Sequence, residues 1–171
     1  MKKTLFLTLI FSNLIFSQNI DFEGFMNFSY SNNSGEIHLE VNNLDKEFLY
    51  INSLSRGIGN NDLGLDRGQL GNTRIVFFTK RGNKILMVQP NTRYVSNSDN
   101  YLENKAVEEA FARSVLFSFE IIEEKNNNYI IDLTPLLMND AHGVSQRLRF
   151  SNSGNYSLNK SMSAIELDRT K

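Results

Sequence analysis

The sequence contains no cysteine, and it has only two histidines, His38 and His142, among its 171 residues. Without cysteine the chain has no disulfide bond, no thiolate metal site and no thiol nucleophile, so packing alone must stabilise its fold. A catalytic zinc ion needs three protein ligands, which are often histidines. Two imidazoles far apart in the sequence fall short of that set.

Clustered positive charge is also missing. The chain has 18 Lys and Arg residues against 19 Asp and Glu, and its formal net charge is −1. The basic residues occur singly or as pairs such as Lys80-Arg81. Because nucleic-acid-binding domains concentrate Lys and Arg on one face, we expect no nucleic-acid partner.

The N-terminus has the pattern of a signal peptide. Lys2 and Lys3 precede a mainly apolar stretch over residues 5–16, and the small residue Ser17 follows it. The stretch is too short to span a membrane, and no cysteine follows it to carry a lipid anchor. It also lacks the polar face that a helix packed on the core would show. We therefore predict a signal peptide at 1–17, cleaved after Ser17, and an exported chain, periplasmic or extracellular, with no membrane attachment after cleavage.

Residues 18–171 form the predicted mature part, a single β-rich domain with 16 basic and 19 acidic residues. Phe28 and Tyr30 alternate with polar residues, as do Ile37, Leu39 and Val41. The turn residues 32–35 between them predict a hairpin with one solvent-exposed face. Further strands are expected at residues 48–51, which read as covered on both faces, and at 74–79, 84–89, 115–121, 129–133 and 163–167.

One long helix is expected at about 101–113. Asn100 is suited to cap it, Glu103 completes a capping box, and apolar residues recur at a spacing of four, which predicts that the helix packs on the sheet. Glu109 and Arg113 are spaced for an ion pair. Thr134-Pro135 starts a short helix near 135–139. The predicted fold class is α+β and β-rich, an antiparallel sheet of about 7–9 strands with one packed helix and one short helix.

Residues 54–71 contain five glycines and few large apolar groups, which predicts a long loop. The segment is not a phosphate cradle, because Gly57-Ile58-Gly59 has no third glycine at the required spacing and the segment precedes a strand instead of a helix. Asp62 and Asp66 lack the density of ligands in a calcium loop, so we interpret them as solvated turn carboxylates.

The two histidines are weak candidates for chemistry. His38 lies on the polar face of an alternating strand, where a solvated side chain is expected. His142 follows Asp140 in a loop, and this pair alone is one carboxylate and one imidazole, short of a catalytic zinc site.

Neighbouring acids occur at Glu108-Glu109 and Glu123-Glu124, but adjacent side chains do not converge on one substrate as a catalytic carboxylate pair does. Most serines lie in Asn-rich turns, where local hydrogen bonding explains them. We therefore assign no catalytic, cofactor-binding or metal-binding residue to this chain, and we expect it not to be an enzyme.

Several blocks of sequence, in order, resemble the non-catalytic domain of unknown function that precedes the protease domain in bacterial secreted zinc-dependent metalloproteases of the metzincin-like class. The blocks are Gly64 to Gly71, Val76-Phe77-Phe78, Val88 to Asn91, Ala106-Val107-Glu108, Phe111 to Leu116, Ile131 to Thr134 with Leu137, Asn139 and Asp140, Leu158 to Ser161, and Ser163-Ala164-Ile165. Met162 stands where the family has arginine, and Arg113 where proline is common.

The resemblance implies a downstream catalytic domain in the same polypeptide, in which His-Glu-x-x-His-x-x-Gly-x-x-His holds zinc. This chain would then be a fragment, a structural or regulatory accessory domain without a cofactor of its own. The alternative is a free-standing exported module that binds a peptide or glycan through the glycine loop and an exposed hairpin edge.

Overall fold

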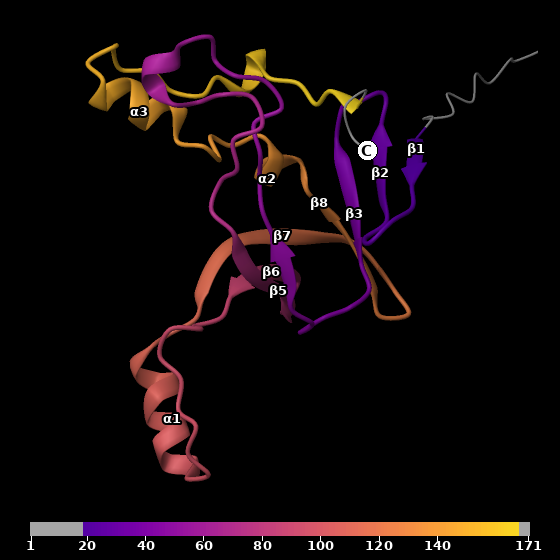
Figure 1. The fold of residues 1–171 in the computed structure, drawn as a ribbon. Coiled ribbons are helices and arrows are strands. Elements are labelled where there is room, and N and C mark those ends of the chain that lie inside the picture. The colour runs from indigo at the N-terminus through magenta and orange to yellow at the C-terminus, as the bar shows by residue number, and fades with distance from the viewer. Residues whose placement is uncertain (1–18, 168–171) are drawn as a thin grey trace, which may run out of the picture.

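A computed structural model describes residues 19–167, and these form an eight-stranded antiparallel sheet that curls on itself (Figure 1). The predicted signal peptide at 1–17 lies outside the described residues. The strands are β1 (Asn19–Phe22), β2 (Phe28–Ser31), β3 (Ile37–Val41), β4 (Phe48–Tyr50), β5 (Arg74–Arg81), β6 (Lys84–Gln89), β7 (Ser114–Lys125) and β8 (Asn128–Asp132). The α-helices are α1 (Tyr101–Ala110), α2 (Thr134–Leu137) and α3 (Val144–Phe150), and 3-10 turns lie at Asn61–Leu63 and Lys160–Met162.

The strands follow the order β1-β2-β3-β8-β7-β6-β5-β4 across the sheet. β1 to β3 form one antiparallel group and β4 to β7 form another. β8 joins the two groups, because it pairs with β3 on one side and with β7 on the other. The predicted β-rich α+β class and the predicted number of strands are therefore confirmed.

Strand β7 is long enough to serve both groups. Residues 114–120 pair with β6, and residues 121–125 pair with β8 after a register shift between Ile121 and Glu123. An irregularity of this kind bends a strand and increases its twist. The two halves of the sheet consequently turn about the middle of β7 (Figure 1).

The hairpin turns use residues that tolerate a positive φ. Gly35 has a φ of 72° and Gly82 a φ of 60°, and Asn126 and Asn127 have φ values of 52° and 64° between β7 and β8. Two residues with positive φ match the twist of the flanking strands. The turn predicted at residues 32–35 is confirmed, and similar tight turns join β5 to β6 and β7 to β8.

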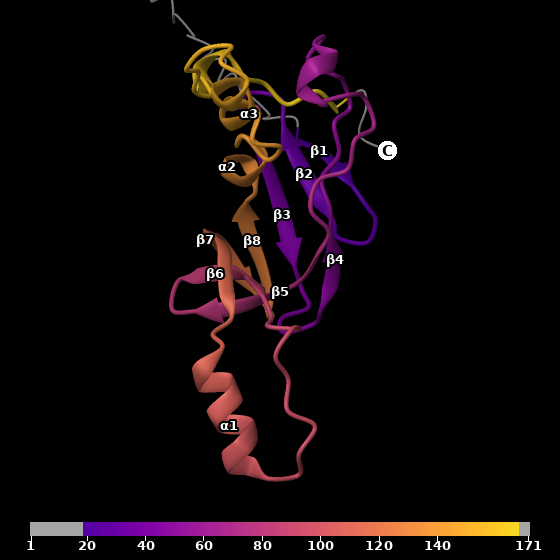
Figure 2. The same ribbon diagram turned by 60° about the vertical axis from the view of Figure 1, so that its left-hand side comes forward.

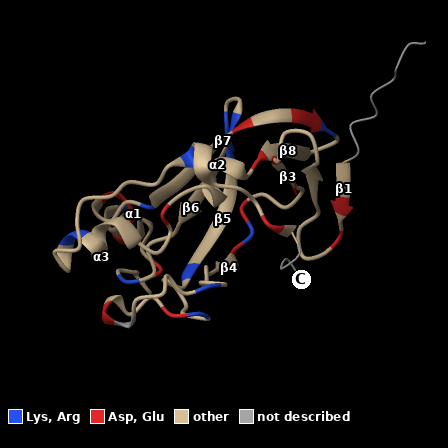
Figure 3. Cartoon of the chain, turned by 90° about the horizontal axis from the view of Figure 1, so that it is seen from above, with Lys and Arg blue, Asp and Glu red and all other residues tan. Residues whose placement is uncertain are grey.

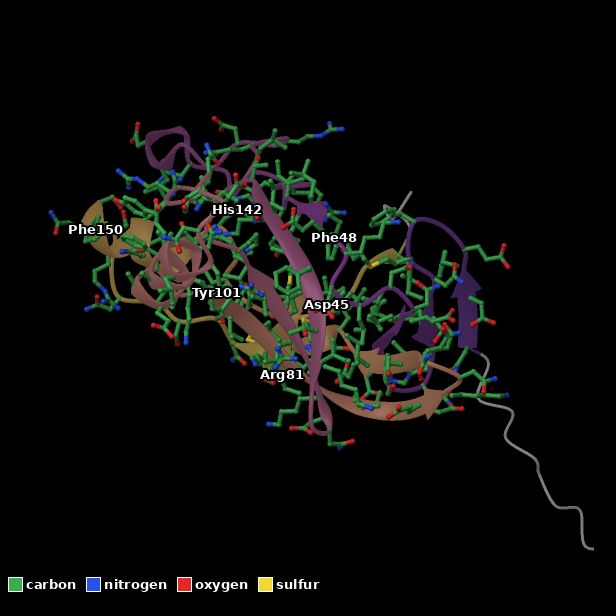
Figure 4. All side chains as sticks on the ribbon, turned by 90° about the horizontal axis from the view of Figure 1, so that it is seen from below. Asp45, Phe48, Arg81, Tyr101, His142 and Phe150 are labelled. Carbon is green, nitrogen blue, oxygen red and sulfur yellow. The ribbon has the colours of Figure 1, made fainter. Side chains whose placement is uncertain are left out.

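The concave side of the sheet carries the core, in which side chains of β3, β5, β6, β7 and β8 meet. Its buried members are Leu39, Val41, Val76, Phe78, Ile85, Met87, Phe119, Tyr129 and Ile131. Burial of each such side chain contributes roughly 1.5–3 kcal/mol. Figure 4 shows Phe48 beside β5, where its ring lies 5.3 Å from that of Phe78 and extends the core towards the edge of the sheet.

The prediction that the long helix packs on the sheet was wrong. α1 projects from one end of the molecule, as two views show (Figures 1 and 2), and none of its residues is buried. Leu102 is 70% exposed. The contact at its base is a stack of Tyr94 on Phe111, with ring centroids 4.1 Å apart. Apolar spacing identified the helix but could not show whether the sheet lies within reach of it.

The cap predicted for α1 is confirmed, because the side-chain oxygen of Asn100 accepts a hydrogen bond from the backbone N–H of Leu102 at 2.9 Å. The predicted roles of Glu103 and Arg113 are not. Glu103 does not close a capping box and instead accepts a hydrogen bond from Ser96. Arg113 pairs with Glu108 at 2.8 Å and not with Glu109, because Arg113 lies beyond the end of the helix.

Two other predictions were wrong. Residues 48–51 are not covered on both faces, because β4 is the last strand of the sheet and Leu49 is 64% exposed. No strand forms in the described part of 163–167, where the chain runs irregularly after a 3-10 turn. The long loop predicted at 54–71 is confirmed, with a 3-10 turn at Asn61–Leu63, and it buries Leu63 and Leu65.

Charged residues are spread over the molecule (Figure 3), with Lys and Arg interspersed among Asp and Glu. Two ion pairs link strands of the sheet. Lys84 of β6 pairs with Glu120 of the neighbouring β7 at 2.8 Å, and Lys80 of β5 reaches past β6 to Glu124 of β7 at 2.6 Å. Lys80 also lies 4.8 Å above the ring of Tyr129. Its bond to the Glu124 carboxylate raises the pKa of Lys80 above its ordinary value.

Candidate functional site

An open groove of about 730 Å³ lies at the end of the molecule opposite α1. Three segments that are distant in sequence line it: the chain that follows β4, the α2–α3 region and the C-terminal tail. Figures 1 and 2 show these segments gathered at the same end of the molecule. Its lining includes Tyr50, Asn52, Leu54, Leu136, Leu137, Asn139, Asp140, His142, Val144, Leu148, Tyr156, Leu158, Asn159 and Met162. Leucine is the commonest residue in this lining.

Asp140 builds one wall of the groove by capping α3. One carboxylate oxygen accepts a hydrogen bond from the backbone N–H of Val144 at 2.7 Å, and the other accepts one from Ser145 at 2.8 Å. A carboxylate at a helix N-terminus also meets the positive end of the helix dipole. Gly143 makes the turn between them possible, because it has a φ of 63°.

The pKa of the Asp140 carboxyl is set by opposing effects. Partial burial raises this pKa, whereas the hydrogen bonds from the backbone of Ser145 and Val144, the Ser145 hydroxyl and the nearby His142 lower it. The lowering effects prevail, so the pKa of Asp140 lies below its ordinary value. Asp140 is therefore ionised and its two oxygens are engaged by α3.

Other contacts hold the three segments together. Arg147 of α3 donates from Nη1 to the backbone oxygens of Leu63 at 3.1 Å and Gly64 at 3.4 Å. Arg56 of the loop forms an ion pair with Glu166 of the tail at 3.2 Å. The loop, α3 and the tail thus form one connected end of the molecule.

The asparagines of the α2 and tail walls shape local turns. The side chain of Asn139 donates to the backbone oxygen of Leu136 at 2.6 Å. The side-chain oxygen of Asn159 accepts from the backbone N–H of Ser161 at 3.1 Å and from its hydroxyl at 2.7 Å. These amides hold the backbone in place and are engaged within the chain.

Two nitrogens of the lining residues are unpaired. Among the described residues, the buried side-chain atoms without a hydrogen-bond partner are Nδ2 of Asn52 and Nε2 of His142. Both residues line the groove. An unsatisfied buried polar group costs roughly 1–3 kcal/mol, and native structures contain few of them.

Gly71 fixes the position of Asn52. The backbone N–H of Gly71 donates to the Asn52 carbonyl oxygen at 2.7 Å. A Cβ atom at Gly71 would lie 2.8 Å from the Asn52 amide nitrogen, which is closer than real Cβ contacts come. Glycine at 71 therefore leaves room for the Asn52 side chain in this position.

His38, Asp62 and Asp66 lie apart from this groove. His38 sits on β3 with Nε2 3.5 Å from the Glu36 carboxylate, on the polar face that the alternation predicted. Asp62 and Asp66 are exposed in the glycine loop. Only His142 and Asp140, of the residues considered from sequence, come together in the groove.

The acidic pairs do not converge. Glu108 binds Arg113, and Glu109 lies 3.7 Å from Lys105. Glu124 binds Lys80, and Glu123 pairs in register with Ile130 of β8. Each pair is thus divided between different neighbours along one element.

The side chains of the described residues do not form a set of ligands for a zinc ion. Over residues 19–167, no group of three or more His, Asp or Glu side chains is placed to hold a metal ion. Within that same range, no helix has the length and apolar character needed to cross a membrane.

The groove itself was not predicted from the sequence. α3 lacks a long apolar repeat, and the tail wall forms no helix or strand beyond a 3-10 turn. The sequence signal that could have indicated α3 is the Asp140-Ala141-His142-Gly143 turn, because it places a carboxylate ahead of the first N–H groups of that helix.

The chain is thus a β-rich α+β domain whose irregular segments form a groove at one end. Residues 68–171 match the family described as Domain of unknown function (DUF5117), and the chain belongs to this family. The match covers α2, α3 and the tail wall of the groove but not the wall at residues 50–54. No curated protein and no solved structure matches the chain.

Proposed function

We propose that this chain is the non-catalytic N-terminal accessory domain of an exported zinc-dependent metalloprotease of the metzincin-like class. It gives structural or regulatory support to a catalytic domain downstream in the same polypeptide. The observation that carries the proposal is the position of the sequence blocks that resemble the accessory domain of such proteases. Leu137, Asn139 and Asp140 line one wall of the groove, and Leu158 and Asn159 line the wall opposite.

The surface around the groove has the character of a contact site. Leu137, Tyr156, Leu158 and Met162 are large apolar residues that remain exposed there. Exposed apolar groups gathered at one place mark interaction surfaces more often than chance exposure does. A domain that packs beside a catalytic domain needs such a surface.

Zinc in this proposal belongs to the catalytic domain. Three histidines would hold the ion there, and the ion would lower the pKa of a bound water. The accessory domain supplies no ligand to the ion. Its two departures from the family pattern lie outside its core: Met162 is 85% exposed, and Arg113 pairs with Glu108.

The proposal is tested on the exported proteins of the source organism, separated by size and identified by mass spectrometry. We expect tryptic peptides of this chain and a His-Glu-x-x-His peptide in the same polypeptide, in the periplasmic or extracellular fraction. That polypeptide should cleave casein and lose the activity with a chelator, whereas residues 18–171 alone should not cleave it. Zinc-dependent cleavage by residues 18–171 alone would refute the proposal.

The second candidate is a free-standing exported module that binds a peptide or glycan. The unpaired nitrogens of Asn52 and His142 favour it, because a peptide or glycan offers hydrogen-bonding groups that pair with such nitrogens. A stop codon directly after Lys171 in the transcript, together with a stable monomeric product, would support this second candidate over the first.

A further inference from the structure

We propose that the groove binds an extended, uncharged polypeptide segment that carries aliphatic side chains. The first reason is the pair of unpaired nitrogens. Nδ2 of Asn52 is only a donor, whereas Nε2 of His142 is a donor or an acceptor according to its tautomer. A peptide group offers both a carbonyl oxygen and an N–H, so one backbone satisfies both nitrogens.

The charge of the groove excludes an acidic ligand. Over residues 19–167, Asp140 is the one carboxylate of the lining, and its oxygens are already bound by α3. No Lys or Arg of that described range lines the groove. A carboxylate or phosphate would therefore meet a negative charge without a cation to offset it, whereas a neutral amide would not.

The apolar lining of the groove indicates which side chains the bound peptide carries. Five leucines, at positions 54, 136, 137, 148 and 158, come from all three walls. They give the groove an aliphatic surface with few convergent polar groups, which is the usual composition of a site for an apolar ligand. Aliphatic side chains of a peptide match it in both size and polarity.

The sheet provides a guide for an extended chain. β4 is the last strand of the sheet, and over the described residues no strand pairs with its outer side. Tyr50 ends β4 and Asn52 follows it, and both line the groove. A segment added along this edge by main-chain pairing enters the groove beside Asn52.

Both unpaired nitrogens are buried although their residues line the groove, so binding must turn the Asn52 and His142 side chains towards the peptide. This makes the side-chain resonances of these two residues direct reporters of occupancy. The inference concerns this chain alone and stands whether or not a protease domain follows it.

The test is an NMR titration of the ¹⁵N-labelled protein with the blocked peptide acetyl-Asn-Leu-Leu-Asn-amide. We expect shifts in residues 50–54, 136–148 and 156–162, including the side chains of Asn52 and His142. The matched peptide acetyl-Asn-Asp-Asp-Asn-amide should cause none. His142→Phe keeps the ring volume without the nitrogen and should weaken binding about fivefold or more.

His38→Phe is the control, since His38 lies on β3 outside the groove, and it should bind as the parent does. Leu137→Asp introduces a charge at an already exposed position of the lining and should abolish binding even if His142→Phe does not fold. The proposal is overturned if the leucine peptide causes no shifts at millimolar concentration, if the shifts lie elsewhere, or if Leu137→Asp binds as the parent does.

Discussion

Arg147 donates a hydrogen bond from Nη1 to the backbone oxygen of Leu63, a residue 84 positions earlier in the chain. The bond ties α3 to the glycine loop and gives a loop carbonyl a charged partner. Hydrogen bonds of this type stabilise more than those between neutral groups. The order of the loop thus depends on a helix that the sequence did not reveal.

Arg147→Met keeps the aliphatic part of the side chain and removes the donor. We expect backbone amides of residues 57–68 to exchange hydrogen severalfold faster. Loss of the hydrogen bond lowers the free energy of local opening of the loop by about 1 kcal/mol. Hydrogen exchange with mass spectrometry measures this. Arg149→Met is the control, because Arg149 makes no side-chain bond to the described residues, and equal exchange in both variants would contradict the role of Arg147.

Leu65→Ala should destabilise the fold although the residue lies in a glycine-rich loop. Leu65 is only 1% exposed, and truncation of a buried leucine costs about 2–5 kcal/mol because a cavity remains. Chemical denaturation followed by circular dichroism gives the change in the free energy of unfolding. Leu70→Ala in the same loop, where Leu70 is 64% exposed, should change it by less than about 0.5 kcal/mol.

Asp140→Asn should alter the dependence of stability on pH. The pKa of Asp140 is lowered in the folded state, so its contribution is present above the unfolded pKa of about 3.9 and is lost as pH falls through the folded pKa. The variant should be about 1 kcal/mol less stable at pH 7.

Denaturation curves between pH 7 and pH 3 check this expectation, and the gap between Asp140→Asn and the parent should close towards the acid end. Asp21→Asn, at an exposed position on β1, should follow the parent curve throughout. A gap that stays constant with pH would mean that the variant acts through packing and not through the charge.

Leu102→Ser on α1 should leave the free energy of unfolding within about 0.5 kcal/mol of the parent, because the side chain is largely exposed and α1 is not packed on the sheet. Val76→Ala in the core should cost more than 1 kcal/mol by the same measurement, since Val76 is fully buried. A large loss for Leu102→Ser would mean that α1 folds back onto the sheet in solution.

The strands were predictable where local chemistry decides the structure. The hairpins around Gly35, Gly82 and Asn126 follow from turn residues that accept a positive φ and from alternating side chains on either side. The capping of α1 by Asn100 is local in the same way.

Features that depend on distant residues were not predictable. Leu102 and its apolar neighbours have the spacing of a packed helix, yet α1 projects away from the sheet and buries none of its residues. Leu49 reads as part of a buried run but lies on an edge strand, because strand order is not encoded locally. The groove depends on contacts such as that of Arg147 with Leu63, which no sequence period marks.

Pairing of β3 with β8 sets an order of assembly. His38 lies opposite Asp132, so during synthesis the first hairpin must wait until most of the chain has been made before its inner edge is covered. Until then its backbone groups offer a template to any other extended chain. Slow closure of this long-range contact makes the nascent protein vulnerable to aggregation at β3, and a chaperone that shields that strand would raise the yield.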